Sequence, residues 1–266
     1  MKVIIESGAT KTAWCAGGLR FETAGMNFAH QSAEFLRGIL ADAASRIGPG
    51  VEEVHLYAAG LIGEPPVDLG EFFPGADIEC ASDLLAAARA VCGHGEGIAA
   101  IIGTGSNSCR YDGERIVANF HGGGYIIGDE GGAASLGRMF IADFVKDLVP
   151  PELADAFAAA GFETDYGAIV AKVYRSEAPA KYFGSVAPVV TANMHIPYAR
   201  ELVLNNFRAF FERALLRYGK GLPVGVIGGF AKALEFELRA VGAEYGISFT
   251  SIAASPMEGL IKYHGI

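Results

Sequence analysis

Seven residues near the start of the chain, Glu6-Ser7-Gly8-Ala9-Thr10-Lys11-Thr12, have the composition of a turn that binds phosphate. They stand between two short apolar runs, residues 3–5 and 13–16, which are typical of buried strands. We expect Gly8 to let the backbone turn where a Cβ would clash. The N–H groups of such a turn can converge on an anion.

The side chains of this turn extend the same chemistry. Thr10, Lys11 and Thr12 add hydrogen-bond donors. Glu6 is expected at the end of the first strand, where a carboxylate can hold a hydrated Mg²⁺. The composition therefore suggests a cradle for a phosphate and a metal ion. The alternative is an ordinary hairpin with a polar tip, because short turns of glycine and threonine are common.

Asp83 is the second carboxylate with a candidate role. It follows a predicted strand over residues 76–80 and precedes an alanine-rich helix predicted over residues 84–91. Either Ser82 or Asp83 suits the N-cap of that helix. The functional alternative places Asp83 at the mouth of a cleft as a base, and position alone leaves both interpretations open.

A second glycine turn, Gly103-Thr104-Gly105-Ser106-Asn107, follows a predicted strand over residues 98–102. Asp112-Gly113 is a strong signal for the next hairpin turn. The resulting order of strand, glycine turn, strand, turn and strand echoes residues 2–25. We therefore predict an internal repeat of a fold unit. Two such turns at equivalent places can hold a nucleotide's phosphates from both sides.

Residues 121–132 contain six glycines, too many for the interior of a helix or strand. We expect them to permit close approach of the backbone to a ligand. Asp129 and Glu130 suit the start of a helix, where carboxylates interact favourably with the helix dipole. That helix is predicted to run over residues 133–149 and to end before Pro150.

Gly228-Gly229 separates a predicted buried strand, residues 223–227, from a predicted helix over residues 230–241. The start of a helix after a glycine pair is a good place for a nucleotide to lie against the backbone. Taken alone, the segment is an ordinary turn between a strand and a helix. The preceding residues 152–219 are predicted to be mostly helical, with a last helix over residues 196–218.

Length and composition limit the remaining classes. The 266 residues suit one large domain or two small ones, and the net charge of −9 argues against a nucleic acid partner. The four cysteines are scattered and form no zinc or disulfide pattern. We expect no signal peptide and no membrane span, and hence a soluble cytoplasmic protein. No Walker A or dinucleotide-binding glycine pattern occurs.

Together, these stretches resemble the N-acetylglucosamine kinase family and its relatives, the ATPases that activate benzoyl-CoA reductase. Both belong to the actin/hexokinase/heat-shock ATPase superfamily. The resemblance spans nearly the whole chain, ends at Ser255-Pro256-Met257-Glu258-Gly259, and is most specific in Gly-Thr-Gly-Ser-Asn and Gly-Asp-Glu-Gly. It implies an α/β fold with two ribonuclease-H-like domains flanking a nucleotide cleft. The implied domains are residues 1–95, joined by a final helix over 255–266, and residues 96–254 with a helical insertion.

The resemblance also implies an ATP-dependent kinase of glucosamine, N-acetylglucosamine or a related hexose, with ATP and Mg²⁺. Asp83 would take the proton of the sugar hydroxyl, and Glu6 would help to place Mg²⁺. The implied ATP-binding residues are Gly8, Thr10, Lys11, Thr104, Gly105, Gly228 and Gly229. The implied sugar-binding residues are Asn27, Asp83, Ser106, Asn107 and Asp129.

One departure from the family bears on the substrate. The acetylglucosamine kinases carry Trp in the glycine run where this chain has Gly123, which weakens the case for the N-acetyl group. Two other functions stay open: an activator ATPase, which would need closely placed cysteines for an iron–sulfur cluster, and a non-catalytic sugar sensor. The oligomeric state is also open, with a homodimer as one candidate.

Overall fold

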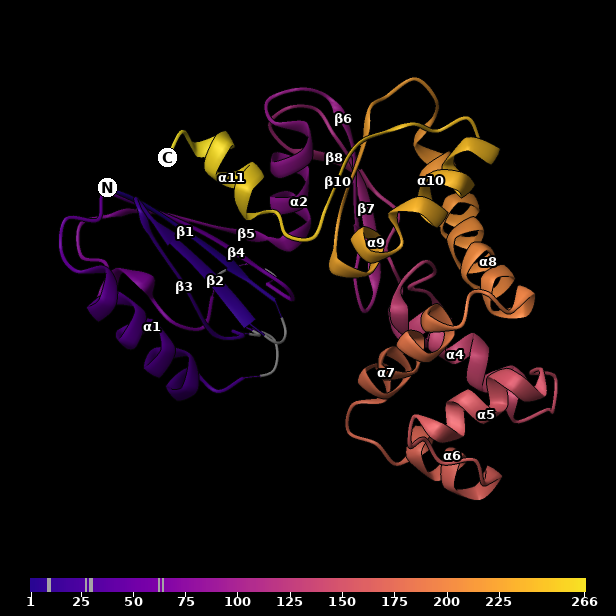
Figure 1. Cartoon of the computed structure of the whole chain (residues 1–266). Helices are drawn as coiled ribbons and strands as arrows, with labels where there is room; N and C mark the ends of the chain where they lie inside the picture. The colour runs from indigo at the N-terminus through magenta and orange to yellow at the C-terminus, as the bar shows by residue number, and fades with distance from the viewer. Residues whose placement is uncertain (9–10, 27, 29–30, 62, 64) are drawn as a thin grey trace. The chain divides into compact units, whose positions relative to one another are not determined.

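The computed structural model describes residues 1–8, 11–26, 28, 31–61, 63 and 65–266 (Figure 1). These residues form two compact units. Unit 1 comprises Met1–Gly97, Tyr111–Val117 and Ser255–Ile266. Unit 2 comprises Ile98–Arg110 and Ala118–Ala254.

Unit 1 is built on a five-stranded sheet in the order β3-β2-β1-β4-β5. Its strands are β1 (Lys2–Ser7), β2 (Lys11–Ala16), β3 (Leu19–Ala24), β4 (Glu53–Ala58) and β5 (Asp77–Ser82). Its helices are α1 (Ala33–Ile47), the short 3-10 helix η1 (Leu69–Glu71), α2 (Asp83–Cys92) and α11 (Met257–His264). Strand β1 is antiparallel to β2 and parallel to β4, and β4 is parallel to β5.

Both faces of this sheet are covered by apolar side chains, because successive side chains of β1 point to opposite faces. Val3 and Ile5 pack in one buried cluster with Leu36 of α1. Ile4 points to the opposite face, where it packs in a second cluster with Leu260 of α11. Each unbroken apolar run in the sequence thus supplies both layers of the core.

Unit 2 contains a second five-stranded sheet, in the order β10-β9-β6-β7-β8. Its strands are β6 (Gly97–Ile102), β7 (Ser106–Tyr111), β8 (Ile116–Asn119), β9 (Val224–Ile227) and β10 (Phe249–Ala253). Its helices are α3 (Gly124–Ile127), α4 (Ala133–Phe144), α5 (Pro151–Ala159), α6 (Tyr166–Tyr174), α7 (Pro179–Ala192), α8 (Pro197–Arg213), η2 (Leu215–Tyr218), α9 (Gly229–Ala233) and α10 (Glu235–Glu244).

The two sheets share one topology. If β6 to β10 are matched in chain order to β1 to β5, the strand order of unit 2 becomes that of unit 1. The predicted internal repeat of a fold unit is therefore confirmed, and so is the α/β class. The sequences of the two units do not repeat, because burial pattern and turn positions suffice to specify the same arrangement of strands.

Helices α4 and α7 of unit 2 cross at very close range. Gly137 of α4 faces the backbone of Phe183, and a Cβ at this glycine would lie 1.9 Å from the Phe183 carbonyl oxygen. Around this crossing, Phe140, Phe157 and Val186 are fully buried. The close contact depends on the missing side chain of Gly137.

Three predicted helices differ from those found. The helix predicted over residues 133–149 ends at Phe144, and the one over 196–218 ends at Arg213 before η2. The helix predicted over residues 230–241 is divided at Leu234 into α9 and α10. In each case no glycine or proline marks the break, so the apolar pattern runs on past the point where the backbone turns.

The glycine run also differs from the prediction. We expected no helix or strand within residues 121–132, yet Gly124–Ile127 forms the short helix α3. The following helix begins at Ala133 as predicted, with Gly132 as its N-cap, so Asp129 and Glu130 precede it and are not part of its first turn. Asp129 instead has a positive φ of 58°, a conformation that leaves the helical region.

A polar network on the α2 and α11 side of the unit 1 sheet holds the last helix in place. Arg89 of α2 donates two hydrogen bonds to Glu79 of β5, at 2.7 and 2.8 Å, and one to the Tyr57 hydroxyl at 2.6 Å. The Tyr57 hydroxyl lies 2.8 Å from Nε2 of His264. The ring of His264 stacks on His55, with ring centroids 3.7 Å apart.

This network predicts a dependence of stability on pH. Burial, with smaller effects from His55 and Arg89, lowers the pKa of His264 from 6.5 to about 4. The folded protein therefore keeps His264 neutral where the unfolded chain takes up a proton. The resulting stability is present above pH 6.5 and is lost as pH falls from 6.5 to about 4, by at most about 1.4 kcal/mol per pH unit.

The measurement is denaturant unfolding at pH 7 and pH 5 for the wild type and for His264→Gln. The variant should lose less stability than the wild type between these two pH values. His195→Gln, which changes an exposed histidine of unit 2, serves as the control and should behave like the wild type. Equal losses in the wild type and His264→Gln would contradict the assignment.

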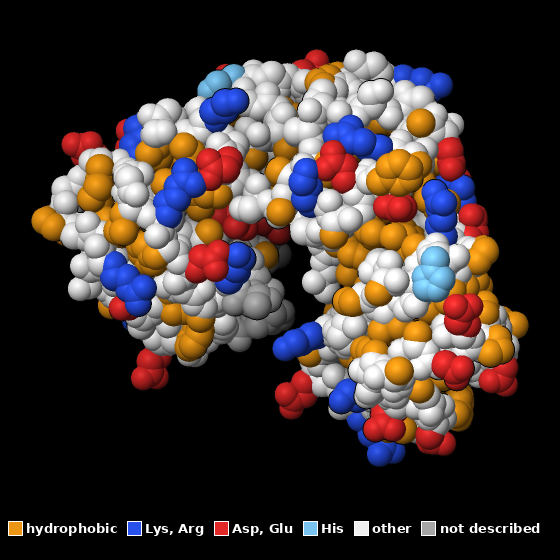
Figure 2. Space-filling view, viewed as in Figure 1, with side chains coloured by type: hydrophobic (Ala, Val, Ile, Leu, Met, Phe, Trp, Pro, Cys, Tyr) orange, Lys and Arg blue, Asp and Glu red, His pale blue; other side chains and the backbone are white. Residues whose placement is uncertain are grey.

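Two surface properties complete the description. Side chains of Lys and Arg are interspersed with those of Asp and Glu over the face shown in Figure 2. Among the described residues, no helix combines the length and apolar character needed to cross a membrane.

Candidate active site

The carboxyl ends of three parallel strands bring two acidic residues to one edge of the unit 1 sheet. The strand register pairs Ser7 at the end of β1 with Ala58, and Ala58 with Ser82 at the end of β5. Glu6 therefore lies at the same edge as Asp83, which is the first residue of α2. Side chains gathered at this edge of an α/β sheet are well placed to meet a ligand.

The electrostatics show that the two carboxylates affect each other. Burial raises the pKa of Glu6, the negative charge of Asp83 raises it further, and Lys11 lowers it. Burial also raises the pKa of Asp83, while the N–H groups of Asp83 and Leu84 lower it. Two partly buried carboxylates that are costly to ionise together are suited to a cation or to accepting a proton.

The capping residue of α2 is Ser82. Its hydroxyl accepts a hydrogen bond from the N–H of Leu85 at 3.2 Å. Asp83 is therefore not needed as the N-cap, and the interpretation in which it only caps the helix is wrong. Its carboxylate lies at the sheet edge, where it meets the N–H groups of Asp83 and Leu84 at the start of α2.

The first hairpin has the expected turn, but Gly8 is not required by it. The N–H of Gly8 donates to the carbonyl of Lys11 at 3.0 Å. A Cβ at Gly8 would lie 3.6 Å from that same oxygen, an ordinary contact, and φ of Gly8 is not in the left-handed region. Among the described residues, a Cβ at Gly8 therefore meets no clash. The ammonium group of Lys11 pairs with Glu22.

Thr12 was expected to add a donor for a ligand, and this is wrong. Thr12 and Ser7 are fully buried, and their hydroxyl oxygens are 2.7 Å apart. Both oxygens accept hydrogen bonds from the N–H of Met26, at 3.1 and 2.9 Å. They fix the segment that follows β3. Thr10 and Asn27 lie outside the described residues.

In unit 2, the two predicted ATP-binding segments lie at one edge of the sheet. Strands β6 and β9 are parallel neighbours, and each leads directly into a glycine segment. A Cβ at Gly228, where φ is 141°, would lie 2.1 Å from the carbonyl oxygen of Ile102. Gly228 therefore rests on the end of β6, next to Thr104 and Gly105. Gly229 has open space around it.

The glycine run packs against this loop, backbone against backbone. A Cβ at Gly132 would lie 2.8 Å from the carbonyl oxygen of Thr104, and one at Gly122 would lie 2.1 Å from that of Ser106. The N–H of Ala133 donates to the carbonyl of Gly103 at 2.9 Å. We had expected these glycines to admit a ligand. The structure shows that Gly122 and Gly132 instead admit the neighbouring loop.

Three of the predicted sugar-binding residues come together beside this loop. The N–H of Ser106 donates to the Asp129 carboxylate at 3.4 Å, and its hydroxyl donates to the carbonyl of Glu130 at 2.6 Å. Burial raises the pKa of Asp129, and the N–H of Ser106 lowers it. Asn107 accepts from the side chain of Asn119 at 2.9 Å. Ser106 and Asn107 begin β7 and so do not belong to the turn.

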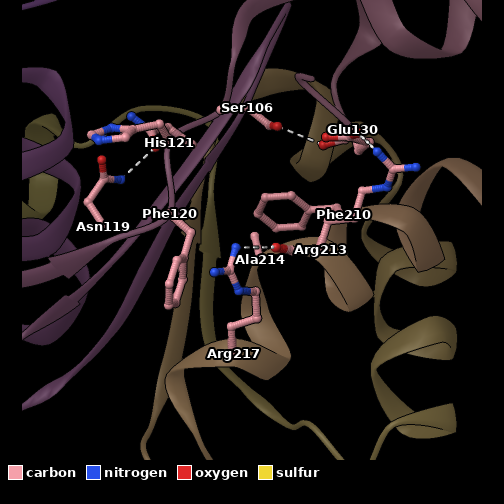
Figure 3. Close-up of a pocket in the computed structure, with 11 residues that line it drawn as sticks. Ser106, Asn119, Phe120, His121, Glu130, Phe210, Arg213, Ala214 and Arg217 are labelled. Atoms are coloured by element: carbon pink, nitrogen blue, oxygen red, sulfur yellow. Dashed lines mark hydrogen bonds and ion pairs between the residues drawn. The ribbon is translucent and has the colours of Figure 1, made fainter. Parts of the chain in front are cut away.

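A cavity of about 340 Å³ opens next to these residues, within unit 2 (Figure 3). Its volume is at the small end of the range of about 300–1,000 Å³ that is typical of ligand pockets. It suits a monosaccharide better than a nucleotide. The lining residues are Ser106, Asn107, Asn119, Phe120, His121, Gly122, Glu130, Phe210, Arg213, Ala214 and Arg217.

The α8 helix fixes the loop that borders this cavity. Asn206 is 1% exposed, and its side chain accepts from the N–H of Gly131 at 3.0 Å and donates to the carbonyl of Gly132 at 3.1 Å. A Cβ at Gly131 would lie 2.9 Å from Cβ of Phe210. The position of the Asp129–Glu130 segment is thus set from α8, about 75 residues further along the chain.

Comparison with solved structures decides the family. A candidate N-acetylglucosamine kinase from Porphyromonas gingivalis is 38% identical, with a TM-score of 0.88 and an alignment that covers 99% of this chain and 98% of that one. The chain belongs to the N-acetylglucosamine kinase family. The resemblance to this family and the fold of two ribonuclease-H-like domains are thereby confirmed.

More distant structures share the fold of this N-acetylglucosamine kinase family member. A second candidate N-acetylglucosamine kinase, from Chromobacterium violaceum, is 21% identical with a TM-score of 0.71, and the alignment covers 98% of both chains. A ROK family glucokinase from Streptomyces griseus, solved with glucose and AMPPNP, is 16% identical with a TM-score of 0.57, covering 98% of this chain and 97% of that one. No family model and no curated protein matches the chain.

Sequence reasoning missed the far side of the cavity in this family member. His121 and Phe210 line the cavity, and neither was among the predicted site residues. Arg213 ends α8 and Arg217 lies in η2, and their spacing in the sequence does not identify them as lining residues, because the cavity is made by segments about 80 residues apart in sequence.

Proposed function

We propose that the protein is an ATP-dependent kinase that phosphorylates a hydroxyl of glucosamine, N-acetylglucosamine or a related hexose. The observation that carries this proposal is the position of Asp83, a partly buried carboxylate beside Glu6 that is not used as a helix cap. The 38% identity to a candidate N-acetylglucosamine kinase supports it. We further propose that the enzyme acts in the cytoplasm.

In this proposal, main-chain N–H groups hold the triphosphate. Gly8, Thr10 and Lys11 of the first hairpin bind phosphates, as do Thr104 and Gly105 of the second glycine loop. Gly228 and Gly229 lie along the adenosine. Among the described residues, a Cβ at Gly8 or Gly229 meets no clash, which supports these roles, because a ligand can approach the backbone closely there.

Asp83 is proposed as the base that orients the acceptor hydroxyl and takes its proton as the γ-phosphoryl group is transferred. Its raised pKa brings the carboxylate closer to that task than an exposed aspartate would be. Asn27, Ser106, Asn107 and Asp129 are proposed to hydrogen-bond the sugar, together with Asp83 itself.

Magnesium fits the acidic edge of unit 1. Glu6 and Asp83 are close enough for the charge of one to raise the pKa of the other, so a cation would relieve their repulsion. We propose that Glu6 helps to hold Mg²⁺, whose chemistry would be to neutralise the phosphate charge of ATP. Carboxylate oxygens are the ligands that this ion prefers.

The direct test is the release of ADP by the purified protein with ATP and Mg²⁺ against a panel of hexoses and amino sugars. ADP release that depends on one class of sugar is the expected result. Sugar binding without any phosphoryl transfer would indicate the non-catalytic sensor instead. A brown colour after anaerobic purification would indicate the activator ATPase, although two of the four cysteines, Cys15 and Cys109, are buried.

The substitution Gly8→Ala, which adds one methyl group, tests whether Gly8 contributes to nucleotide binding or to folding. Gly8→Ala should lower ATP affinity about tenfold or more, because the added Cβ occupies the space where a phosphate would meet the backbone. Its melting temperature should not fall, since the Cβ makes only an ordinary contact at 3.6 Å.

The matched control for this variant is Gly18→Ala at the tip of the next hairpin, where a Cβ also meets no clash. It should leave ATP affinity unchanged and should not lower the melting temperature. A nucleotide titration that finds normal affinity in Gly8→Ala would remove this hairpin from the ATP site.

A further inference from the structure

The cavity in unit 2 has the lining expected of a carbohydrate site. Side-chain amides of Asn107 and Asn119, the ring of His121 and the carboxylate of Glu130 can donate or accept hydrogen bonds around a sugar. Phe210 adds an apolar surface. Two of the residues proposed to bind the sugar, Ser106 and Asn107, line the same cavity.

The charges around the cavity do not cancel. Arg213 forms an ion pair with Glu130, in which Nη1 of Arg213 lies 2.8 Å from Oε1 of Glu130. The Glu130 side chain is only 18% exposed. Within the part of the chain that the structure describes, Arg217 forms no ion pair with a carboxylate. One positive charge therefore remains at the cavity beyond those that the protein itself neutralises.

Arg217 is held in place by contacts that leave its charge uncompensated. Its guanidinium carbon lies 3.7 Å from the centroid of the Phe120 ring, and one of its N–H groups donates to the carbonyl of Arg213 at 3.5 Å. Figure 3 shows Arg217 beside Phe120 among the lining residues. A cation stacked on an aromatic ring keeps its planar fork free to meet an anion.

We propose that the cavity binds the acceptor sugar and that Arg217 binds a carboxylate on it, so that the substrate class is an acidic sugar. A carboxylate matches the single uncompensated charge, whereas a phosphate monoester carries about −1.5 to −2 and would leave negative charge unpaired. Arginine also pairs with a carboxylate through two parallel hydrogen bonds. This inference rests on the proposed function, since it names the substrate of that same site.

The test compares sugar pairs that differ only by a carboxylate. N-acetylmuramic acid is N-acetylglucosamine with a lactyl ether, and glucuronic acid is glucose with an oxidised terminal carbon. Binding of each sugar to the full chain is measured by calorimetry without ATP, and ADP release is measured separately. In at least one pair, the acidic sugar should bind about tenfold or more tightly than its neutral parent.

Variants of Arg217 identify the group responsible. Arg217→Gln should remove the preference for the acidic sugar, and Arg217→Lys should keep part of it. Arg200→Gln, which changes an exposed arginine near the start of α8, should keep all of it. Arg217 is itself exposed, so its replacement should lower the melting temperature only slightly, through the lost contact with Phe120.

The outcomes separate this inference from the proposed function. If acidic and neutral sugars bind equally, or if the preference survives in Arg217→Gln, the inference is wrong even though sugar-dependent ADP release continues. Tighter binding of glucosamine 6-phosphate than of either acidic sugar would also overturn it, in favour of a phosphate site. If no sugar releases ADP, the proposed kinase is wrong, while the calorimetry still decides whether Arg217 binds a carboxylate.

Discussion

Replacing Asp83 by Asn is expected to reduce sugar-dependent ADP release by about a hundredfold or more, while ATP still binds. General-base assistance of this kind is typically worth about 10²–10⁴-fold. The amide keeps the shape of the side chain but cannot accept the hydroxyl proton. The measurement is steady-state ADP release with the best sugar of the panel, together with a nucleotide titration.

Stability distinguishes this loss of activity from a loss of fold. Because the pKa of Asp83 is raised, protonation of this group stabilises the folded protein at low pH, and that contribution is lost as pH rises through the folded-state pKa. An uncharged Asn avoids this loss, so Asp83→Asn should be at least as stable as the wild type at pH 7.

The control is Asp77→Asn, at the opposite end of β5, where the side chain is exposed. It should retain normal ADP release. Turnover of Asp83→Asn within a few fold of the wild type would exclude Asp83 as the base. A lowered melting temperature in Asp83→Asn would show that the residue is structural.

Replacing Gly137 by Ala is expected to destabilise the protein by about 1–3 kcal/mol, through forced separation of α4 and α7. The new Cβ would lie 1.9 Å from the carbonyl oxygen of Phe183. This carbonyl group belongs to the backbone of α7 and cannot rotate away as the end of a side chain could. Denaturant unfolding followed by circular dichroism measures the loss. The α4 helix begins at the loop that carries Asp129, so sugar-dependent activity should fall as well.

Gly38→Ala is the matched control, because Gly38 is also inside a helix and a Cβ there meets nothing within 4 Å. This variant should stabilise the protein by about 0.5–1 kcal/mol, since alanine has less backbone freedom to lose on folding. Two identical substitutions should therefore move stability in opposite directions. Similar effects from both would contradict the account of the α4–α7 crossing.

The strands were predictable because local signals define them. Short apolar runs predicted strands such as β1, β2, β6 and β9, and Asp112-Gly113 marked the turn between β7 and β8 correctly. The ends of the helices were harder to predict from the sequence. After Phe144 the chain turns because the N–H groups of Lys146 and Leu148 both donate to the carbonyl of Asp143. No glycine or proline in residues 145–148 signals this turn in the sequence.

The candidate site was predictable where it follows strand ends. The sequence placed Glu6 at the end of a strand and Asp83 just after one, and the parallel register of β1, β4 and β5 shows that these ends share one edge. The roles of the glycines were harder to foresee. Whether a glycine admits a ligand, as we propose for Gly8, or a second loop, as at Gly132, depends on what the fold brings opposite to it.

Unit 1 is assembled from three separate stretches of the chain, and Gly259 of α11 rests against Ala90 of α2, where a Cβ would lie 2.4 Å from the Ala90 carbonyl oxygen. During translation, the whole of Ala118–Ala254 therefore leaves the ribosome before the first sheet can receive its last helix. Unit 2 of a nascent chain should therefore complete its folding before unit 1. A fragment that ends at Cys92 would expose the apolar face that Leu260 normally covers.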